Sequence, residues 1–355
     1  MTAGATPVPS VLVPQAELRR FARDLLMIRG GASADHADVV VEHLLEADAM
    51  GLRSHGVMRV PQYLAEIKTG EIDPQAAPRI AQSSPGRAAV DGGKGFGQVV
   101  GHAMADEAVR LAAEAGISFV TGRYMGHTGR IGAYAEAMAR RGAVGIAVCS
   151  GPRNGHWVAP FGGLEGRLAT NPIAFAFPTD KRPPVVADFS TSVAPEGVIR
   201  SLLHRGLAAP PGALRDAHGA STDDPAALYR TPRGAIQPLG GPFGYRGTAL
   251  AILVEILAAP LAHDDTDDLG RQGSNLAMIA IGADDHFAER AARMVDYIRS
   301  CPPIDPANPV MMPGEREHSA ATRLGDGPIN VDRPTWLAMV ASAEADIEVP
   351  ASSSD

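Results

Sequence analysis

His55 and Arg59 lie four residues apart and are the most informative pair of side chains for chemistry in this chain. An imidazole exchanges a proton near neutral pH, and a guanidinium grips a carboxylate through two parallel hydrogen bonds. Together they suit redox chemistry at the carbon next to a carboxylate. The tripeptide Ser54-His55-Gly56 alone proves little, because most histidines at helix starts are caps or packed side chains.

A second histidine, His127, follows a predicted strand over residues 117–121 and precedes a predicted helix over residues 131–141. Ligands collect at strand ends in open sheets. The small neighbours Gly126 and Gly129 also leave backbone amides open to a ligand. A loop histidine that bonds only to the backbone is an equally good interpretation.

Other candidate motifs are weaker. Residues 170–172 and 188–192 begin and end predicted strands and offer hydroxyls, an amide and a carboxylate to a cofactor, but turn and capping roles explain them equally well. The glycine run 92–97 has Val100 where a dinucleotide loop needs its third glycine, so a tight turn is favoured. The acidic run 263–268 lacks the glycine and terminal glutamate of a calcium loop, so no metal is expected.

Composition limits the classes of function. The chain has 355 residues, of which 45% are hydrophobic, and a net charge of -8, which argues against a nucleic-acid or anionic-membrane partner. Its two cysteines, Cys149 and Cys301, form neither a metal motif nor a disulfide framework, so we expect a cytoplasmic protein. No targeting segment is recognised, and no apolar run is long enough to span a bilayer.

Helices are predicted first, over residues 15–27 and 34–50, with Ser33 capping the second. The next helix either starts near Val60, which leaves His55 in a loop, or kinks at Pro61. Strands and helices then alternate from about residue 79, which indicates an α/β or α+β domain. Strands are predicted over residues 88–90, 117–121, 144–149, 173–177, 185–189 and 276–281, and helices over 98–115, 131–141, 193–203, 249–261, 287–299 and 334–345. We expect a helical lobe from residues 1–78 and 290–355, and an α/β domain from residues 79–289.

Taken in order, these segments resemble the malate/L-lactate dehydrogenase family, which lacks a Rossmann fold. That family includes ureidoglycolate, sulfolactate and diketogulonate oxidoreductases and a cyclic-imine reductase. The likeness covers roughly residues 13–345. The matching pieces are residues 47–59, Tyr63, Gly70, and residues 126–129, 159–163, 170–174, 188–192, 238–241, 254–257 and 313–315.

The resemblance implies a mainly antiparallel mixed sheet with helices, plus a helical lobe built from both termini. It implies NAD or NADP as cofactor, a small carboxylate substrate and a homodimer. His55 and His127 would flank the reacting carbon, and Ser54 and Arg59 would bind the substrate. The residues implied to contact the cofactor are Ser150, Thr170, Asn171, Pro172, Asp188, Phe189, Ser190, Arg246, Pro313, Gly314 and Glu315.

The chain departs from the family pattern near this implied site. Arg246 stands where the family usually has lysine, and the two cations are not interchangeable at a close contact. Val198 stands where a lysine usually follows glycine, and the loop over residues 149–158 is longer than usual. The resemblance implies hydride transfer between a nicotinamide cofactor and C2 of a small 2-hydroxy or 2-oxo acid, or a cyclic imino acid, with His55 or His127 as proton donor. The alternative is a family scaffold whose altered cofactor site serves non-redox chemistry or binding.

Overall fold

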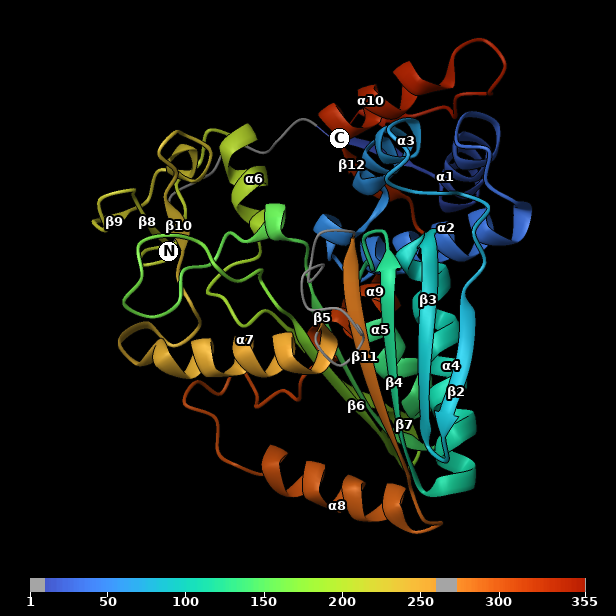
Figure 1. The fold of residues 1–355 in the computed structure, drawn as a ribbon, viewed down its shortest axis with the longest axis vertical. Coiled ribbons are helices and arrows are strands. Elements are labelled where there is room, and N and C mark those ends of the chain that lie inside the picture. Colours follow the sequence, from blue (N-terminus) through green and yellow to red (C-terminus); the bar gives the residue numbers. More distant parts are fainter. Residues whose placement is uncertain (1–9, 260–272, 355) are drawn as a thin grey trace.

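A seven-stranded mixed sheet forms the centre of the computed structural model, which describes residues 10–259 and 273–354 (Figure 1). Neighbouring strands are antiparallel except for the β3–β4 pair. The mainly antiparallel sheet implied by the family resemblance is therefore confirmed. The strands in spatial order are β2 (Arg79–Ser84), β3 (Arg87–Gly95), β4 (Ile117–Met125), β11 (Ser274–Gly282), β5 (Ala143–Ser150), β6 (Ile173–Thr179) and β7 (Arg182–Phe189).

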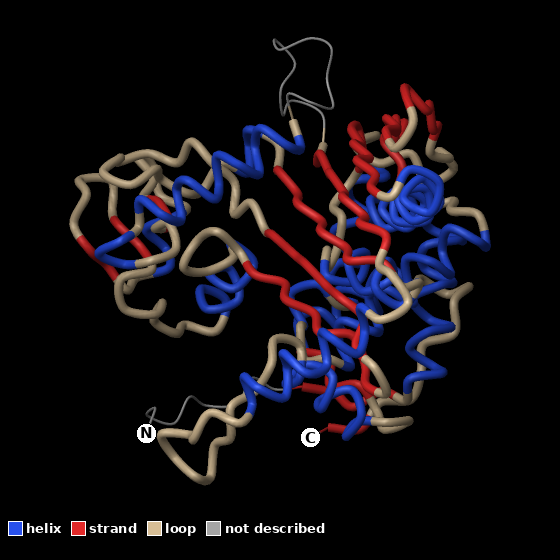
Figure 2. Tube along the Cα trace, turned by 90° about the horizontal axis from the view of Figure 1, so that it is seen from below, coloured by secondary structure: helices blue, strands red, loops and turns tan. Residues whose placement is uncertain are grey.

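Helices cover both faces of this sheet (Figure 2). On one face, α4 (Gly97–Ala115) and α5 (Gly132–Arg140) share a core with Ala147 and Cys149 of β5. On the other face, Val148 of β5 packs with α7 (Tyr245–Ala258). This alternation along β5 is the period of two that a strand buried on both faces must have.

A helical lobe caps one end of the sheet and unites the two ends of the described chain. β1 pairs with both β12 and β13, and Phe21 of α1 packs on Trp336 of α10 with ring centroids 5.6 Å apart. The elements of this lobe are β1 (Ser10–Val13), α1 (Gln15–Asp24), a π-helix (Leu25–Arg29), α2 (Ala34–Ala49), α3 (Val60–Lys68), β12 (Ile329–Asp332), α10 (Arg333–Ala343) and β13 (Ser353–Ser354).

Two other parts complete the architecture. A small lobe over residues 151–172 and 190–241, the segments that flank β6 and β7, has its own core, which includes Ile199 and Ile236. Its elements are α6 (Glu196–His204), β8 (Leu214–Arg215), β9 (Ser221–Thr222) and β10 (Ala235–Ile236). Helix α8 (Phe287–Arg299) packs through Val295 on Phe177 of β6, so its contacts are with the sheet and not with the helical lobe. The division into two domains remains a prediction.

Proline and capping side chains explain several element boundaries. Pro61 occupies the first turn of α3, where its missing N–H costs nothing, so the alternative that leaves His55 in the preceding turn is the one observed. The Ser33 side chain accepts a hydrogen bond from the amide of His36, as its predicted cap role requires. Helix α6 starts at Glu196, three residues later than predicted, directly after Pro195.

Some sequence predictions concern residues outside the described part. The predicted end of the 249–261 helix and the acidic run 263–268 lie there. Within residues 10–259 and 273–354, no helix is long and apolar enough to cross a membrane. In the same residues, no group of three or more histidine, cysteine, aspartate or glutamate side chains is arranged to hold a metal ion.

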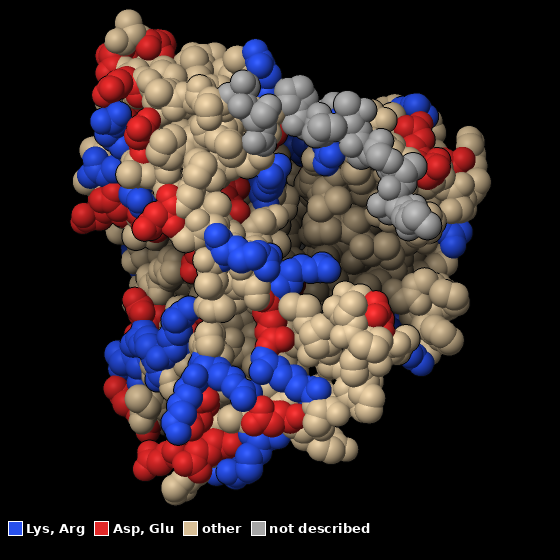
Figure 3. Space-filling view, turned by 180° about the vertical axis from the view of Figure 1, so that it is seen from behind, with Lys and Arg blue, Asp and Glu red and all other residues tan. Residues whose placement is uncertain are grey.

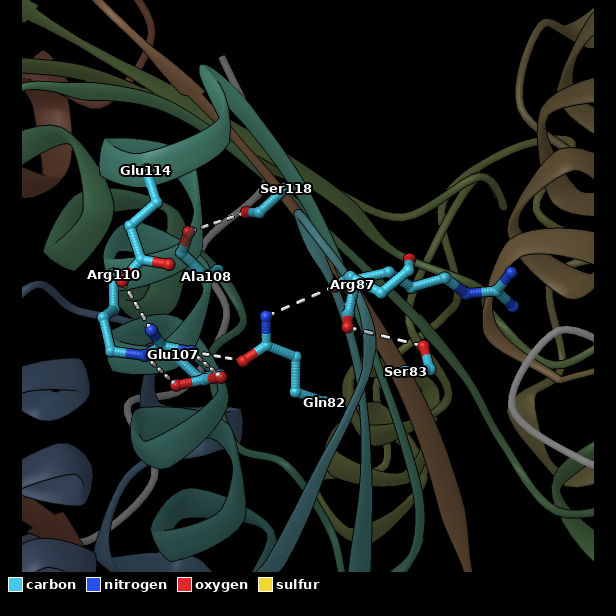
Figure 4. A network of polar contacts seen from close by, with 9 residues as sticks. Gln82, Ser83, Arg87, Glu107, Ala108, Arg110, Glu114 and Ser118 are labelled. Atoms are coloured by element: carbon cyan, nitrogen blue, oxygen red, sulfur yellow. Dashed lines mark hydrogen bonds and ion pairs between the residues drawn. The ribbon is translucent and has the colours of Figure 1, made fainter.

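A polar network on the surface joins α4 to the edge strand β2 (Figure 4). Arg110 pairs with Glu107 at 2.7 Å and with Glu114 at 2.8 Å, and its Nη2 also donates to Gln82 of β2 at 3.2 Å. Ser118 anchors the start of β4 by donating to a carbonyl of α4 at 2.7 Å. These contacts lie at the β2 edge, remote from the residues predicted to do chemistry.

Candidate functional site

A short turn over residues 53–59, between α2 and α3, carries His55. Asp48 near the end of α2 holds this turn, because its Oδ2 accepts a 2.8 Å hydrogen bond from the amide of Val57. A Cβ on Gly56 would lie 1.9 Å from Oδ1 of Asp48, so a larger residue here would displace this carboxylate from the turn. Burial raises the pKa of the Asp48 carboxyl to about 7.

His55 faces the main cavity of the molecule. Its Nδ1 lies 2.9 Å from the hydroxyl oxygen of Ser54. A hydroxyl can donate or accept, so this contact suits either protonation state of the ring. Burial, assisted by the positive charges of Arg59 and Arg130, lowers the pKa of His55 to about 4. The imidazole is therefore neutral at physiological pH and able to accept a proton.

His127 lies in the loop after β4 and stacks on His55, with ring centroids 5.7 Å apart and planes inclined by 25°. Its Nδ1 faces the Tyr63 hydroxyl at 2.9 Å and the backbone amide of Gly129 at 3.3 Å. Because a backbone N–H can only donate, Nδ1 is an acceptor and the neutral ring carries its proton on Nε2. Gln98 completes the set by donating to the Tyr63 hydroxyl at 2.7 Å. Burial lowers the pKa of His127 well below its usual value.

The first turn of α4 supports the His127 loop from behind. A Cβ on Gly97 would lie 2.5 Å from the carbonyl oxygen of His127 and 2.6 Å from that of Gly126. The glycine run 92–97 therefore lets a helix start approach the loop closely, and it does not line the main cavity.

Arg59 lies behind Ser54 and keeps part of its guanidinium available. Its Nε donates to the carbonyl of Ser54 at 2.7 Å, and its Nη1 donates to the side-chain oxygen of Gln62 at 2.6 Å. Within the described residues Nη2 has no hydrogen bond, and a Cβ on Gly197 would lie only 3.1 Å from it. Glycine at this position leaves the guanidinium uncovered, which suits a carboxylate ligand.

The main cavity has a volume of about 970 Å³ and runs from the His55 turn past β7 to α9 (Glu315–Leu324). Figure 3 shows that the rear face of the molecule is hollowed and that the visible walls of the hollow are mostly uncharged. Of the predicted site residues, those that line the cavity are Ser54, His55, Thr170, Pro172, Asp188, Phe189, Ser190, Pro313 and Gly314.

Asp188 and Ser190 are fixed where β7 leaves the sheet. Oδ2 of Asp188 accepts a 2.7 Å hydrogen bond from the amide of Gly132 at the start of α5, and burial raises the pKa of this carboxyl. The hydroxyl of Ser190 donates to the carbonyl of Thr170 at 2.9 Å. These contacts hold the predicted cofactor segments 170–172 and 188–190 side by side.

Four predicted cofactor residues do not line the cavity. Ser150 and Asn171 are fully buried, and Asn171 donates to Glu255 of α7 at 2.9 Å. Arg246 is exposed, with its guanidinium over the ring of Phe243.

Glu315 is the fourth, and its side chain is held by its own segment. It accepts a hydrogen bond from the amide of Met312 at 2.8 Å and pairs with Arg299 of α8. The roles of Ser150, Asn171, Arg246 and Glu315 toward a cofactor stay predictions.

The residues present fit a nicotinamide dinucleotide. The N-terminus of α9 opens on the cavity after Gly314, whose φ is +84°, and free N–H groups at a helix start suit a phosphate. Phe175, Phe189 and Met311 give the cavity apolar surface for an aromatic base. Within the described residues, the buried Ser150 Oγ and Asn171 Oδ1 have no hydrogen-bond partner, so polar groups next to Thr170 and Pro172 of the lining remain unsatisfied.

Sequence reasoning assigned no role to Asp48, Tyr63 or Gln98. Tyr63 had a usable signal, since it lies four residues after Arg59 and therefore one helical turn along the same face. Gln98 belongs to a helix distant in sequence, and only the packing of α4 against α3 and the His127 loop brings it to Tyr63. No local pattern indicates that contact.

Residues 13–340 match the model of a protein family described as malate/L-lactate dehydrogenase. The chain is 33% identical to an L-lactate dehydrogenase of Cupriavidus necator over 345 residues, which cover 94% of this chain and 97% of that protein. It is 35% identical to a Delta(1)-pyrroline-2-carboxylate reductase of Burkholderia ambifaria over 241 residues, or 68% of each chain. The crystal structure of a dehydrogenase from Sinorhizobium meliloti superposes with a TM-score of 0.82 at 32% identity, covering 94% of this chain and 98% of that one.

Proposed function

This chain belongs to the malate/L-lactate dehydrogenase family, and on that premise we propose that it transfers a hydride between NAD or NADP and C2 of a small 2-hydroxy or 2-oxo acid, or the equivalent carbon of a cyclic imino acid. The family recognised from the sequence is thereby confirmed. The observation that carries the proposal is the stacked pair His55 and His127, of which His55 lines a cavity of cofactor size. His127 and Arg59 lie behind this lining and are not part of it.

The two histidines have different parts in this proposal. His127 is fixed as the Nε2–H tautomer by Tyr63 and Gly129, so it acts as a neutral hydrogen-bond donor toward the C2 oxygen. His55 exchanges the proton, because its Nδ1 faces the Ser54 hydroxyl, which can donate or accept. Protonation of His127 would place a hydrogen on Nδ1, where it would face the N–H of Gly129, so this ring is less suited to exchange a proton.

Arg59 orients the substrate. Its Nη2, left uncovered by Gly197, binds the carboxylate and fixes C2 beside the histidine pair. A bound nicotinamide supplies or accepts the hydride. In the oxidation direction His55 takes the hydroxyl proton as the carbonyl forms, and in the reduction direction it returns that proton to the same oxygen.

Two measurements test this function. Binding of NADH and NADPH is followed by quenching of cofactor fluorescence, and absorbance at the nicotinamide band then follows reduction of pyruvate, oxaloacetate, phenylpyruvate and piperideine-2-carboxylate. We expect micromolar to millimolar binding of at least one cofactor and turnover of at least one acid. Failure of both cofactors to bind at millimolar concentration contradicts the proposal.

The proposal includes a homodimer. On α7, the side chains of Ile252, Leu253 and Ile256 are about half exposed (51%, 49% and 51%), which is unusual for neighbouring branched apolar residues on a monomer surface. A second copy would cover this face. Light scattering on the purified protein should give twice the chain mass, and Ile252→Glu with Ile256→Glu should give a monomer.

A cytoplasmic location is also part of the proposal. Both cysteines are free thiols in the structure, and Cys149 is buried in the sheet core. Unpaired cysteines are the usual state in a reducing compartment. Fractionation of the source cells, with the protein detected by antibody, tests the location directly.

A further inference from the structure

The wall of the cavity beside His55 is apolar. Leu52 lines it from the turn that carries Ser54, and Val198 lines it from the first turn of α6. These two elements touch, because a Cβ on Gly197, the residue before Val198, would lie 3.7 Å from the Cβ of Ser54. Each of these two elements therefore contributes a hydrocarbon side chain to the cavity wall near the presumed carboxylate site.

The same wall continues into the small lobe. Val193 and Leu239 also line the cavity, and a β-bridge joins Ser192 to Pro238, so they lie on adjoining backbone segments. A 2.9 Å hydrogen bond from the amide of Leu239 to the carbonyl of Thr191 fixes this arrangement. The surface is thus built into the fold and does not depend on a flexible side chain.

Among the residues that the structure describes, no cation on this wall is free to bind a second acidic group. Arg130 lines the cavity, but it is buried against Glu136 at 3.2 Å. Arg200, two residues beyond Val198, is paired with Glu196 at 2.8 Å. The remaining arginine in the lining, Arg316, belongs to α9 and not to the elements that carry Leu52, Val193, Val198 and Leu239. A second carboxylate on the substrate would lose its hydration here without gaining a partner.

We propose that the substrate is a 2-oxo or 2-hydroxy acid whose group beyond C2 is uncharged hydrocarbon and packs on Leu52, Val193, Val198 and Leu239. The inference rests on the proposed function and names its substrate class. An acid with a branched or aromatic side chain gains this apolar contact, whereas pyruvate leaves the wall empty and oxaloacetate places a charge against it. Discrimination of roughly tenfold or more is the usual result of such a pocket.

The experiment compares kcat/KM for 4-methyl-2-oxopentanoate, phenylpyruvate, piperideine-2-carboxylate, pyruvate and oxaloacetate with the cofactor that binds. We expect one of the first three to exceed both pyruvate and oxaloacetate by about tenfold or more. Val198→Lys should lower kcat/KM for the apolar acids and raise that for oxaloacetate. Val198→Thr, which keeps the shape and adds no charge, is the matched control and should not favour oxaloacetate.

The outcomes distinguish a failure of the apolar substrate class from a failure of the oxidoreductase function. If pyruvate or oxaloacetate is the best substrate of the unaltered protein, the apolar substrate class is wrong while the oxidoreductase function stands. If the Val198→Lys variant shows no shift toward oxaloacetate, the wall does not select the side chain, and the inference is overturned. If the cofactor binds but none of the five compounds is reduced, the proposed function fails and this inference fails with it.

Discussion

Two polar clusters in this molecule use similar groups and have opposite surroundings. Around Arg110, an exposed arginine pairs with two glutamates and a glutamine at the β2 edge. Around His127, a fully buried tyrosine and a fully buried glutamine make two neutral hydrogen bonds. The surface cluster has more charge and more contacts. The buried cluster nevertheless constrains its central side chain more strongly than the surface cluster does. Water competes with every surface bond, whereas the His127 ring has only one tautomer that satisfies its neighbours.

The largest expected effect is at the histidine pair itself. His55→Asn keeps a hydrogen-bonding side chain but removes the group that exchanges a proton, so kcat should fall by roughly two orders of magnitude or more. Cofactor binding should change little, since His55 acts on the substrate oxygen. Stopped-flow turnover and fluorescence titration measure the two quantities separately.

His127→Asn is the matched comparison. It should also slow turnover. The pH dependence of kcat should be unchanged, because His55 still exchanges the proton. A His55→Asn variant within about threefold of normal kcat, beside an inactive His127→Asn variant, would transfer the proton role to His127.

Next in size is the loss of the hydrogen bond that fixes His127. Tyr63→Phe removes a donor to Nδ1 and leaves Gly129 as the remaining one, so we expect kcat to fall by about tenfold and KM for the cofactor to stay near its normal value. Nitrogen-15 NMR of the His127 ring should show the Nε2–H tautomer in both proteins, because the Gly129 N–H still donates to Nδ1 in the variant. An unchanged kcat in Tyr63→Phe would mean that Tyr63 does not hold the ring.

Substitution of Asp48 should have a smaller effect, which concerns the stability of the protein and the pH dependence of that stability. Burial raises the pKa of this carboxyl from 3.8 to about 7 in the folded state, so the stability it contributes is present at low pH and is lost as pH rises toward 7 and above. Asp48→Asn keeps an acceptor for the Val57 amide and never ionises. The Tm of the variant should exceed that of the unaltered protein by about 2 °C or more at pH 8 and match it near pH 4.

Asp48→Ala separates the hydrogen bond from the charge. It removes the acceptor altogether and should lower kcat at every pH, because the turn that carries His55 is released. Equal pH dependence of Tm in Asp48→Asn and the unaltered protein would show that the carboxyl is not titrating in this range.

The smallest effect is expected in the surface cluster. Arg110→Ala removes every ion pair of the network, yet Tm should fall by less than about 2 °C, because exposed pairs contribute little once side-chain entropy and salt screening are counted. Catalysis should be unchanged. A larger loss of Tm at 0.15 M salt would mean that the β2 edge depends on this network, and the contrast between the two clusters would fail.

Local rules were sufficient for much of the fold. The cap at Ser33 and the strand over residues 144–149 depend on neighbouring residues and appear where the sequence predicts them. The start of α3 at Val60 is one of the two alternatives that Pro61 left open. β12 was missed because four residues carry too little pattern, and its place beside β1 depends on a chain end more than 300 residues away.

The site was predictable to the extent that it follows the family motifs. Ser54, His55 and Arg59 lie on one turn, so their proximity follows from spacing alone. The position of His127 against His55, and the apolar wall that includes Val198, depend on how separate elements pack. Sequence reasoning saw Val198 only as a lost cation. The structure shows what replaces that cation, namely a hydrocarbon surface.

The close approach of α4 to the His127 loop has a consequence for how the protein tolerates change. Gly97 touches no presumed ligand, yet any larger residue there would press on the carbonyl groups of Gly126 and His127. In a mutational scan, position 97 should therefore be as intolerant as the histidine it supports. A survey that ranked positions by tolerance would mark Gly97 as part of the active centre, although its contribution is only the space it leaves empty.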